Sequence, residues 1–328
     1  MVFASGGRQP PPPPSPPSPP LSPPSSYQSW QKPSAPKPES LENPGTVEEL
    51  FNKVRETQPN CFEGAKIMLN KALSNHFQMS HTIHINNTSP SYHFQSIYAG
   101  TQKHTATEAY PVLLADLDGQ GNLNCNVIHQ VSKRLRCKIG ADFQPGAQNT
   151  PNQATADYRG DDCTFSLTMA SPGLATRCGM IVASLLQSVA PRWAVGAELA
   201  YQCGYNVPGG QNAIVSMVGR YDNGQSMSCA KIGPTGIHLG HYRKCSDQLQ
   251  IGLEVETCLR TMASVATIAY QSKIQKGDVQ FRASLDTSWR VCGELEKRLQ
   301  HSPFTFLLSG CMMHKTGQFK MGAGVIIG

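Results

Sequence analysis

The segment Gly64–Gly328 alternates apolar and polar residues in stretches of roughly ten residues, and no helical period returns within it. In Leu249–Glu256, with the sequence LQIGLEVE, every second residue is a large aliphatic one. The same two-residue period is found in residues 77–86, 195–201 and 279–286. Turn-forming residues separate the stretches, as at Asp118–Gly121 and Asp222–Gly224. Because successive side chains of a strand point to opposite faces, this pattern predicts antiparallel strands with one apolar face.

Two architectures accommodate many such strands, a soluble sandwich or propeller and a closed transmembrane barrel. At roughly 14 residues per strand and turn, the segment holds about nineteen strands, too many for one sandwich core. A propeller would show a repeat of roughly 40 to 50 residues, which the sequence lacks. We therefore expect an all-β transmembrane barrel of about nineteen strands. Its lumen would hold the charges that lie within strands, including Asp142, Asp157, Glu198, Glu254 and Glu256.

The composition agrees with a barrel without requiring one. No run of about 18 apolar residues occurs, which excludes a helical membrane bundle. Mean hydropathy is −0.33, and a barrel gives such a value because lipid-facing and lumen-facing residues alternate. The first sixty residues hold five basic and five acidic groups, so the net charge of +6 lies in the rest of the chain. The bases form no dense cluster, and we expect no nucleic-acid partner.

The N-terminal part divides into two segments. Residues 1–43 are rich in proline and serine and predict a disordered tail, which acts as a tether or as a docking site for proline-reading domains. Residues 44–60 predict a short amphipathic helix, with Thr46 and Glu49 as a capping box and Pro59 at its end. Its apolar stripe, at helical spacing, consists of Val47, Leu50, Phe51 and Val54. Residues 61–328 would form the barrel.

The sequence offers no catalytic or metal-binding motif. The eleven cysteines form no CxxC pair, and we expect free thiols in a reducing compartment. No HExxH, P-loop, GxSxG or dinucleotide fingerprint is present. No apolar secretory segment precedes a cleavage site. We therefore expect no enzyme activity, no cofactor and no metal.

Six short motifs occur in a characteristic order. They are Asn43–Thr46 (NPGT), Leu73–Gln78 (LSNHFQ), Tyr92–Phe94 (YHF), Val127–Gln130 (VIHQ), Tyr158–Gly160 (YRG) and Ser246–Gly252 (SDQLQIG). Together they resemble the channel-forming subunits of the translocase of the mitochondrial outer membrane, the TOM complex, which are eukaryotic mitochondrial porins. The likeness covers residues 43–328. The C-terminal stretch is similar to the mitochondrial β-signal, read by the sorting and assembly machinery that inserts barrels, with Lys320, Gly322, Val325 and Ile327 at its defining positions.

The resemblance implies a barrel in which the first and last strands pair in parallel and a helix lies in the lumen. It implies a protein-conducting channel of the mitochondrial outer membrane that imports unfolded, nuclear-encoded precursors with cleavable presequences. The implied partners are these precursors, TOM receptor subunits, small helical subunits, outer-membrane lipid and the sorting and assembly machinery. The number of cysteines, the tail and the loop 205–210 depart from the family pattern and suggest a divergent or tissue-restricted paralogue.

Presequences are basic amphipathic helices, so inward acids would hold them weakly. We expect the five acids named above to contribute to this contact, with Glu294 and Glu296 as further members. Alternatively, each acid balances a neighbouring lumen base such as Lys138, Arg220 or Arg282. Two other functions stay open, a metabolite or anion channel of the same superfamily and a soluble β-rich scaffold whose tail recruits partners.

Overall fold

The structure, a computed structural model, describes residues 41–86, 90–103, 109–146, 152–173, 178–204, 209–300 and 302–328. These residues form nineteen strands. The strands are β1 (Gly64–Ala72), β2 (Phe77–Ile85), β3 (Ser91–Lys103), β4 (Ala109–Asp118), β5 (Leu123–Gln130), β6 (Leu135–Phe143), β7 (Asn152–Arg159), β8 (Cys163–Gly173), β9 (Cys178–Ala190), β10 (Trp193–Cys203), β11 (Gln211–Asp222), β12 (Ser226–Gly233), β13 (Gly236–Lys244), β14 (Leu249–Cys258), β15 (Ala263–Ile274), β16 (Val279–Asp286), β17 (Arg290–Arg298), β18 (Phe304–Met313) and β19 (Gln318–Ile327). Residues 1–40 of the predicted tail fall outside the described residues, as do residues 205–208 of the divergent loop.

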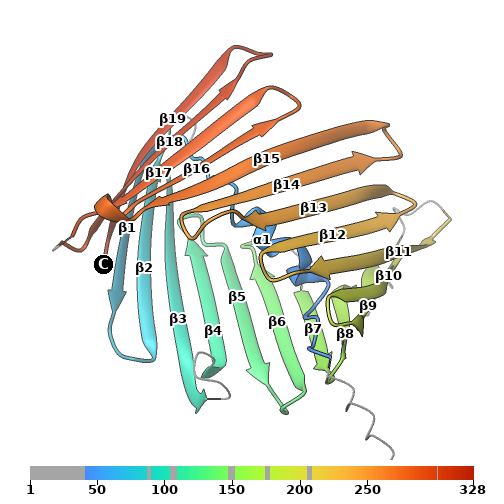
Figure 1. Ribbon diagram of the computed structural model, residues 1–328. Coiled ribbons are helices and arrows are strands. Elements are labelled where there is room, and N and C mark those ends of the chain that lie inside the picture. The colour runs from blue at the N-terminus through green and yellow to red at the C-terminus, as the bar shows by residue number, and fades with distance from the viewer. Residues whose placement is uncertain are drawn as a thin grey trace, which may run out of the picture. The chain divides into compact units, whose positions relative to one another are not determined.

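Strand pairing closes the sheet on itself. Each strand pairs antiparallel with the next along the chain, and β1 pairs in parallel with β19. The parallel register runs from Gly64↔Gly322 to Leu69↔Ile327. Figure 1 shows the strands following one another around a single sheet from β1 (blue) to β19 (red). The predicted closed barrel of nineteen strands is confirmed.

Alternation along each strand sorts side chains between the two faces. The outer face carries large apolar residues that stay exposed, such as Val215, Met217 and Leu239. The inner face carries most of the polar side chains, and many of them are buried against the lumen contents. An apolar belt that runs around a closed sheet suits contact with lipid chains and not with water.

The predicted helix is present but shorter than residues 44–60. A 3₁₀ turn (Glu48–Phe51) leads directly into α1 (Asn52–Arg55), and turns follow up to Pro59. Only half of the capping box forms, because the Glu49 carboxylate accepts the Thr46 backbone N–H at 3.4 Å while the Thr46 hydroxyl is buried with no partner. Within the described residues, no helix is long and apolar enough to cross a membrane.

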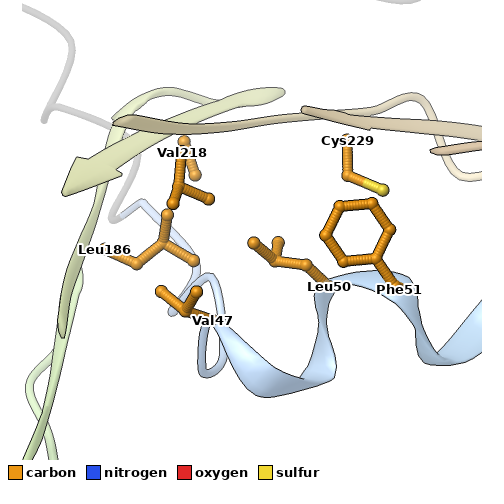
Figure 2. Close-up of a cluster of buried hydrophobic side chains, with 7 residues drawn as sticks. Val47, Leu50, Phe51, Leu186, Val218 and Cys229 are labelled. Atoms are coloured by element: carbon orange, nitrogen blue, oxygen red, sulfur yellow. The ribbon is translucent and has the colours of Figure 1, made fainter. Parts of the chain in front are cut away.

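The helical segment lies against the inner face of the sheet. Val47, Leu50 and Phe51 form one buried cluster with wall residues of β9 to β12 (Figure 2). The wall residues are Leu186, Ala194, Val218 and Cys229. Val54 is fully buried as well. A helix of this length is not stable alone. Burial of its apolar stripe against the wall therefore holds the segment in place.

The expectation of free thiols is wrong for one pair of cysteines. Cys292 of β17 and Cys311 of β18 face each other in the strand register and form a disulfide. Both side chains point inward, since they alternate with outward residues such as Val291 and Met312. Sequence spacing could not indicate the pair, because strand register brings the two sulfurs together. Cys61, Cys125, Cys137, Cys163, Cys229, Cys245 and Cys258 are free.

Candidate functional site

All five acids expected in the lumen lie on the inner face, but they do not form one continuous track. Glu254 and Glu256 lie together on β14, and Glu198 lies on β10. Asp142 and Asp157 lie near the C-terminal ends of β6 and β7, which are antiparallel, so the two acids lie toward opposite rims of the barrel. The wall therefore holds several separate acidic positions, and their neighbours decide which of them are available to a passing chain.

Glu254 is held by three groups. His238 Nε2 donates to its carboxylate at 2.7 Å, Gln58 donates to its second oxygen, and Arg55 Nε lies 3.9 Å away. Glu256, the next inward residue, has its nearest ionic contact with the same histidine at 3.5 Å, and its side chain is 63% exposed. His238, Glu254 and Glu256 form the one group within the described residues whose geometry fits a metal ion. The histidine nitrogen and the Glu254 carboxylate already satisfy each other, so the group is not an open ligand set.

Asp157 is buried beneath the start of the helical segment. Its carboxylate is 1% exposed and lies 3.1 Å from Arg136 and 3.6 Å from Lys138. Glu49 reaches Arg136 at 3.3 Å and Arg159 at 3.4 Å, and Glu48 reaches Lys138 at 3.4 Å. Three acids therefore balance three bases here, and this network ties the helical segment to β6 and β7.

Other inward acids also have basic partners. Glu198 lies 2.7 Å from Lys231, and Glu294 lies 3.2 Å from Arg282. Arg220 pairs with Asp222 on its own strand. Glu296, on the same inner row as Glu294, forms no ion pair within the described part of the chain. Charge balance by neighbouring bases, the alternative that the sequence leaves open, thus describes Asp157, Glu198, Glu254 and Glu294.

Two acids that were not predicted join Asp142. Asp116 and Asp118 lie on the inner face of β4, at 3.5 Å and 4.0 Å from His93 nitrogens. With Asp142, which accepts from Asn124, they line a cavity of about 230 Å³. The sequence feature that could have indicated Asp116 and Asp118 is their position at alternate residues near the end of a predicted strand. It could not be distinguished from any other polar inner face, because only strand pairing brings β3 and β5 beside β4 and places β6 beyond β5.

These less neutralised acids lie near one rim. β4, β6 and β14 all run in the same direction, because every pair of consecutive strands is antiparallel. Each acid lies within two residues of the end of its strand. We call Asp116, Asp118, Asp142 and Glu256 the acidic rim. No lysine or arginine nitrogen of the described residues lies within ion-pair distance of any of them. Among the inward bases near this rim, Lys231 of β12 pairs with Glu198, and Arg290 and Lys320 lie on β17 and β19.

The residues of the C-terminal motif divide between the two faces. Lys320 and Gly322 point inward, and Lys320 pairs with Glu63 at 3.0 Å. Val325 and Ile327 point outward, beside Ile67 and Leu69 of β1. Gly322 lies beneath Phe62, whose carbonyl oxygen would be 2.4 Å from a Cβ at that position.

Comparison with known proteins fits this architecture. Residues 43–322 match the eukaryotic porin family. A Drosophila melanogaster protein, mitochondrial import receptor subunit TOM40 homolog 2, is 52% identical over 298 residues, which are 90% of this chain and 87% of that protein. TOM40 homologs from Caenorhabditis elegans and Homo sapiens are 41% and 38% identical, covering 87% and 88% of this chain and 95% and 79% of theirs.

The closed barrel with an inner helix and a polar lumen is therefore that of a eukaryotic porin, and the chain belongs to this family. Within the family it groups with the TOM40 homologs of the mitochondrial import machinery. It is a barrel of the mitochondrial outer membrane, and it functions as a protein-import channel.

Proposed function

We propose that the lumen conducts unfolded precursor polypeptides across the mitochondrial outer membrane and that the acidic rim contacts their basic presequences. The observation that carries this proposal is the difference between the inward acids. Asp157, Glu198 and Glu254 have close basic partners. The rim acids have only histidine or amide partners. Negative charge that is not already balanced is available at the rim for a passing cationic segment.

The inner surface of β4 changes from acidic to apolar next to the rim. Asp118 and Asp116 come first, and the next inward residues toward the middle of the strand are Leu114 and Val112. Ile97 lies opposite Leu114 on β3, and Ile128 lies opposite Val112 on β5. A basic amphipathic helix could place its charged face on the acids and its apolar face on this strip. The same neighbouring surfaces would serve presequences of many sequences, because neither contact requires a defined side-chain pattern.

The strength of these contacts suits transport. Exposed ion pairs contribute about 0.2–1 kcal/mol each, so the rim would hold a presequence weakly and release it. A channel requires this, because a tightly bound chain would not move on. The paired acids Asp157, Glu198 and Glu254 would contribute less directly, by fixing the helical segment and the charge of the wall.

Block of the reconstituted channel by a presequence peptide in a planar bilayer tests the rim. The double variant Asp116→Asn/Asp142→Asn should raise the half-blocking concentration about three- to tenfold. The matched control is Asp161→Asn/Asp247→Asn, which removes two exposed acids that lie in turns between strands. It should leave the block unchanged. Equal block of the rim variant and the wild type would overturn the proposal.

A metabolite or anion channel is the second candidate, and the net charge of +6 favours it. The two functions differ in ion selectivity, because unbalanced rim acids favour cations. Marked anion preference in the same bilayer would support the second candidate.

The proposed partners follow from family membership. We infer that the chain assembles with TOM receptor subunits and small helical subunits, and that its C-terminal motif is read by the sorting and assembly machinery. Purification from mitochondria in mild detergent should recover those subunits together with this chain. Migration of the chain alone would contradict the assembly.

A further inference from the structure

The four residues Asn60–Glu63 connect the helical turns to β1 and lie inside the barrel. They form no regular secondary structure, yet each of them has at least one polar contact with the wall. We call them the inner strap. Their contacts fall on β17, β18 and β19 and on β1 and β2, the strands on the two sides of the parallel seam.

The strap is bonded to β17 and β18 through its backbone. The Asn60 N–H donates to the Glu294 carboxylate at 2.9 Å. Ser309 bonds Phe62 twice, because its hydroxyl oxygen accepts the Phe62 N–H at 3.2 Å and its proton is donated to the Phe62 carbonyl at 2.7 Å. The Cys61 thiol lies 3.6 Å from the carbonyl oxygens of Gly293 and Gly310. A segment without secondary structure thus obtains its hydrogen bonds from the last strands of the chain.

The strap also contacts the other side of the seam. His84 Nε2 of β2 donates to the Glu63 carbonyl at 2.8 Å, and the ring of Phe62 packs edge-on against the His84 imidazole. The Lys66 ammonium of β1 lies 5.7 Å from the centre of the Phe62 ring. The Glu63 carboxylate pairs with Lys320 of β19 at 3.0 Å. Phe62 and Glu63 therefore bridge the first two strands and the last two.

Two glycines of β19 receive Phe62. A Cβ at Gly322 would lie 2.4 Å from the Phe62 carbonyl oxygen and 2.7 Å from its ring, and a Cβ at Gly324 would lie 3.1 Å from the ring. Any side chain at 322 would push the strap off the wall. The glycine of the C-terminal motif thus has a role in the folded barrel that is separate from recognition during insertion.

The seam is the one pairing that has no turn to support it. Every other pair of neighbouring strands is consecutive in the chain, whereas β1 and β19 lie at opposite ends of it. Their register spans only six residue pairs, and parallel pairing is slightly less stable per residue than antiparallel pairing. A segment that bonds to both sides replaces the missing connection.

We propose that the inner strap is a lock for the barrel seam. By binding the inner face of β17–β19 and the start of β1–β2 together, it holds the parallel pair closed and covers the lumen face of the C-terminal motif. Strap docking must follow release of that motif from any protein that covers the same face during insertion.

Hydrogen exchange of the refolded barrel in detergent tests the lock without requiring insertion machinery. Ser309→Ala removes two strap bonds and should speed exchange of the β1 and β19 amides about five- to tenfold, leaving the β12–β13 hairpin unchanged. Ser284→Ala is the matched control, because this inward serine of β16 has no hydrogen-bond partner within the described residues. Its exchange pattern should equal that of the wild type.

A second pair of variants separates the strap from Ser309 itself. Gly322→Ala displaces Phe62 and should reproduce the seam-restricted acceleration, whereas Gly219→Ala on β11, where a Cβ meets nothing within 4 Å, should not. Unchanged exchange at β1 and β19 in both Ser309→Ala and Gly322→Ala would overturn the lock. Equal acceleration of all strands would also overturn it, since that result would make the strap a general stabiliser of the barrel.

Discussion

The ring of Phe51 lies flat on the imidazole of His238, with ring centroids 3.7 Å apart and planes 7° apart. His238 in turn donates to Glu254, which also accepts from Gln58 at the end of the helical segment. His238 is therefore linked to the helical segment in two ways. The face of its ring stacks on Phe51, and its Nε2 is connected to Gln58 by the Glu254 carboxylate. This arrangement couples the position of the segment to the polar groups of β13 and β14.

Truncation of the apolar stripe should release the segment from the wall. Leu50 is almost completely buried, so Leu50→Ala should reduce the free energy that holds the segment by about 2–5 kcal/mol. Trypsin should then cleave after Lys53 or Arg55 faster than in the wild type. Phe306→Ala, on the outer face, is the control, and its cleavage rate should stay unchanged. Equal cleavage rates for Leu50→Ala and the wild type would show that the stripe does not hold the segment.

Close approach of the segment to β14 depends on Gly252. A Cβ there would lie 2.2 Å from the Thr57 hydroxyl oxygen and 3.2 Å from the Val54 carbonyl. Gly252→Ala should therefore lower the free energy of unfolding by about 1–3 kcal/mol, measured by thermal unfolding in detergent. Gly219→Ala meets nothing within 4 Å and should be close to neutral. Adding Thr57→Ala should recover part of the loss, and a double variant no more stable than Gly252→Ala would contradict this contact.

Removal of the Asp157 charge should cost more than removal of an exposed acid. Asp157→Asn leaves Arg136 and Lys138 without their buried partner and should destabilise the barrel by about 3 kcal/mol. Asp161→Asn breaks an exposed pair with Arg134 and should cost less than about 1 kcal/mol. Denaturant unfolding of both variants checks the difference. Equal losses would show that the network beneath the helical segment is not energetically special.

The reactivity of Cys61 should report burial of the inner strap. Burial raises the pKa of the Cys61 thiol, and the nearby Glu294 carboxylate raises it further. Only the thiolate is alkylated, so near neutral pH Cys61 should react with iodoacetamide more slowly than the exposed Cys245. Its rate should keep rising above the ordinary thiol pKa of roughly 8.5. Mass spectrometry of the labelled peptides measures both rates, and a plateau of the Cys61 rate at the ordinary pKa would contradict the shift.

The two-residue alternation of Gly64–Gly328 determines that the chain forms strands with one apolar face. Successive side chains of a strand point to opposite faces, so apolar residues at every second position all lie on one face. The helical spacing of Val47, Leu50, Phe51 and Val54 likewise marks the inner segment. Its length is not determined in this way. The regular α-helix ends at Arg55, although backbone N–H groups up to Gln58 still bond to carbonyls three or four residues earlier, and the Gln58 side chain is bonded to Glu254 of the wall.

Only the tertiary structure decides which charges meet. The sequence places Asp142 and Asp157 on the lumen face in the same way, yet Asp157 is covered by Arg136 and Lys138 while Asp142 faces Asn124. The difference arises from strand register and from the position of Glu48 and Glu49, which no local pattern contains. The sequence by itself therefore determined the strands and their two faces, because alternation is a local property. The acidic rim and the disulfide depend on the register of neighbouring strands, and the inner strap depends on closure of the sheet, which brings residues from both ends of the chain together.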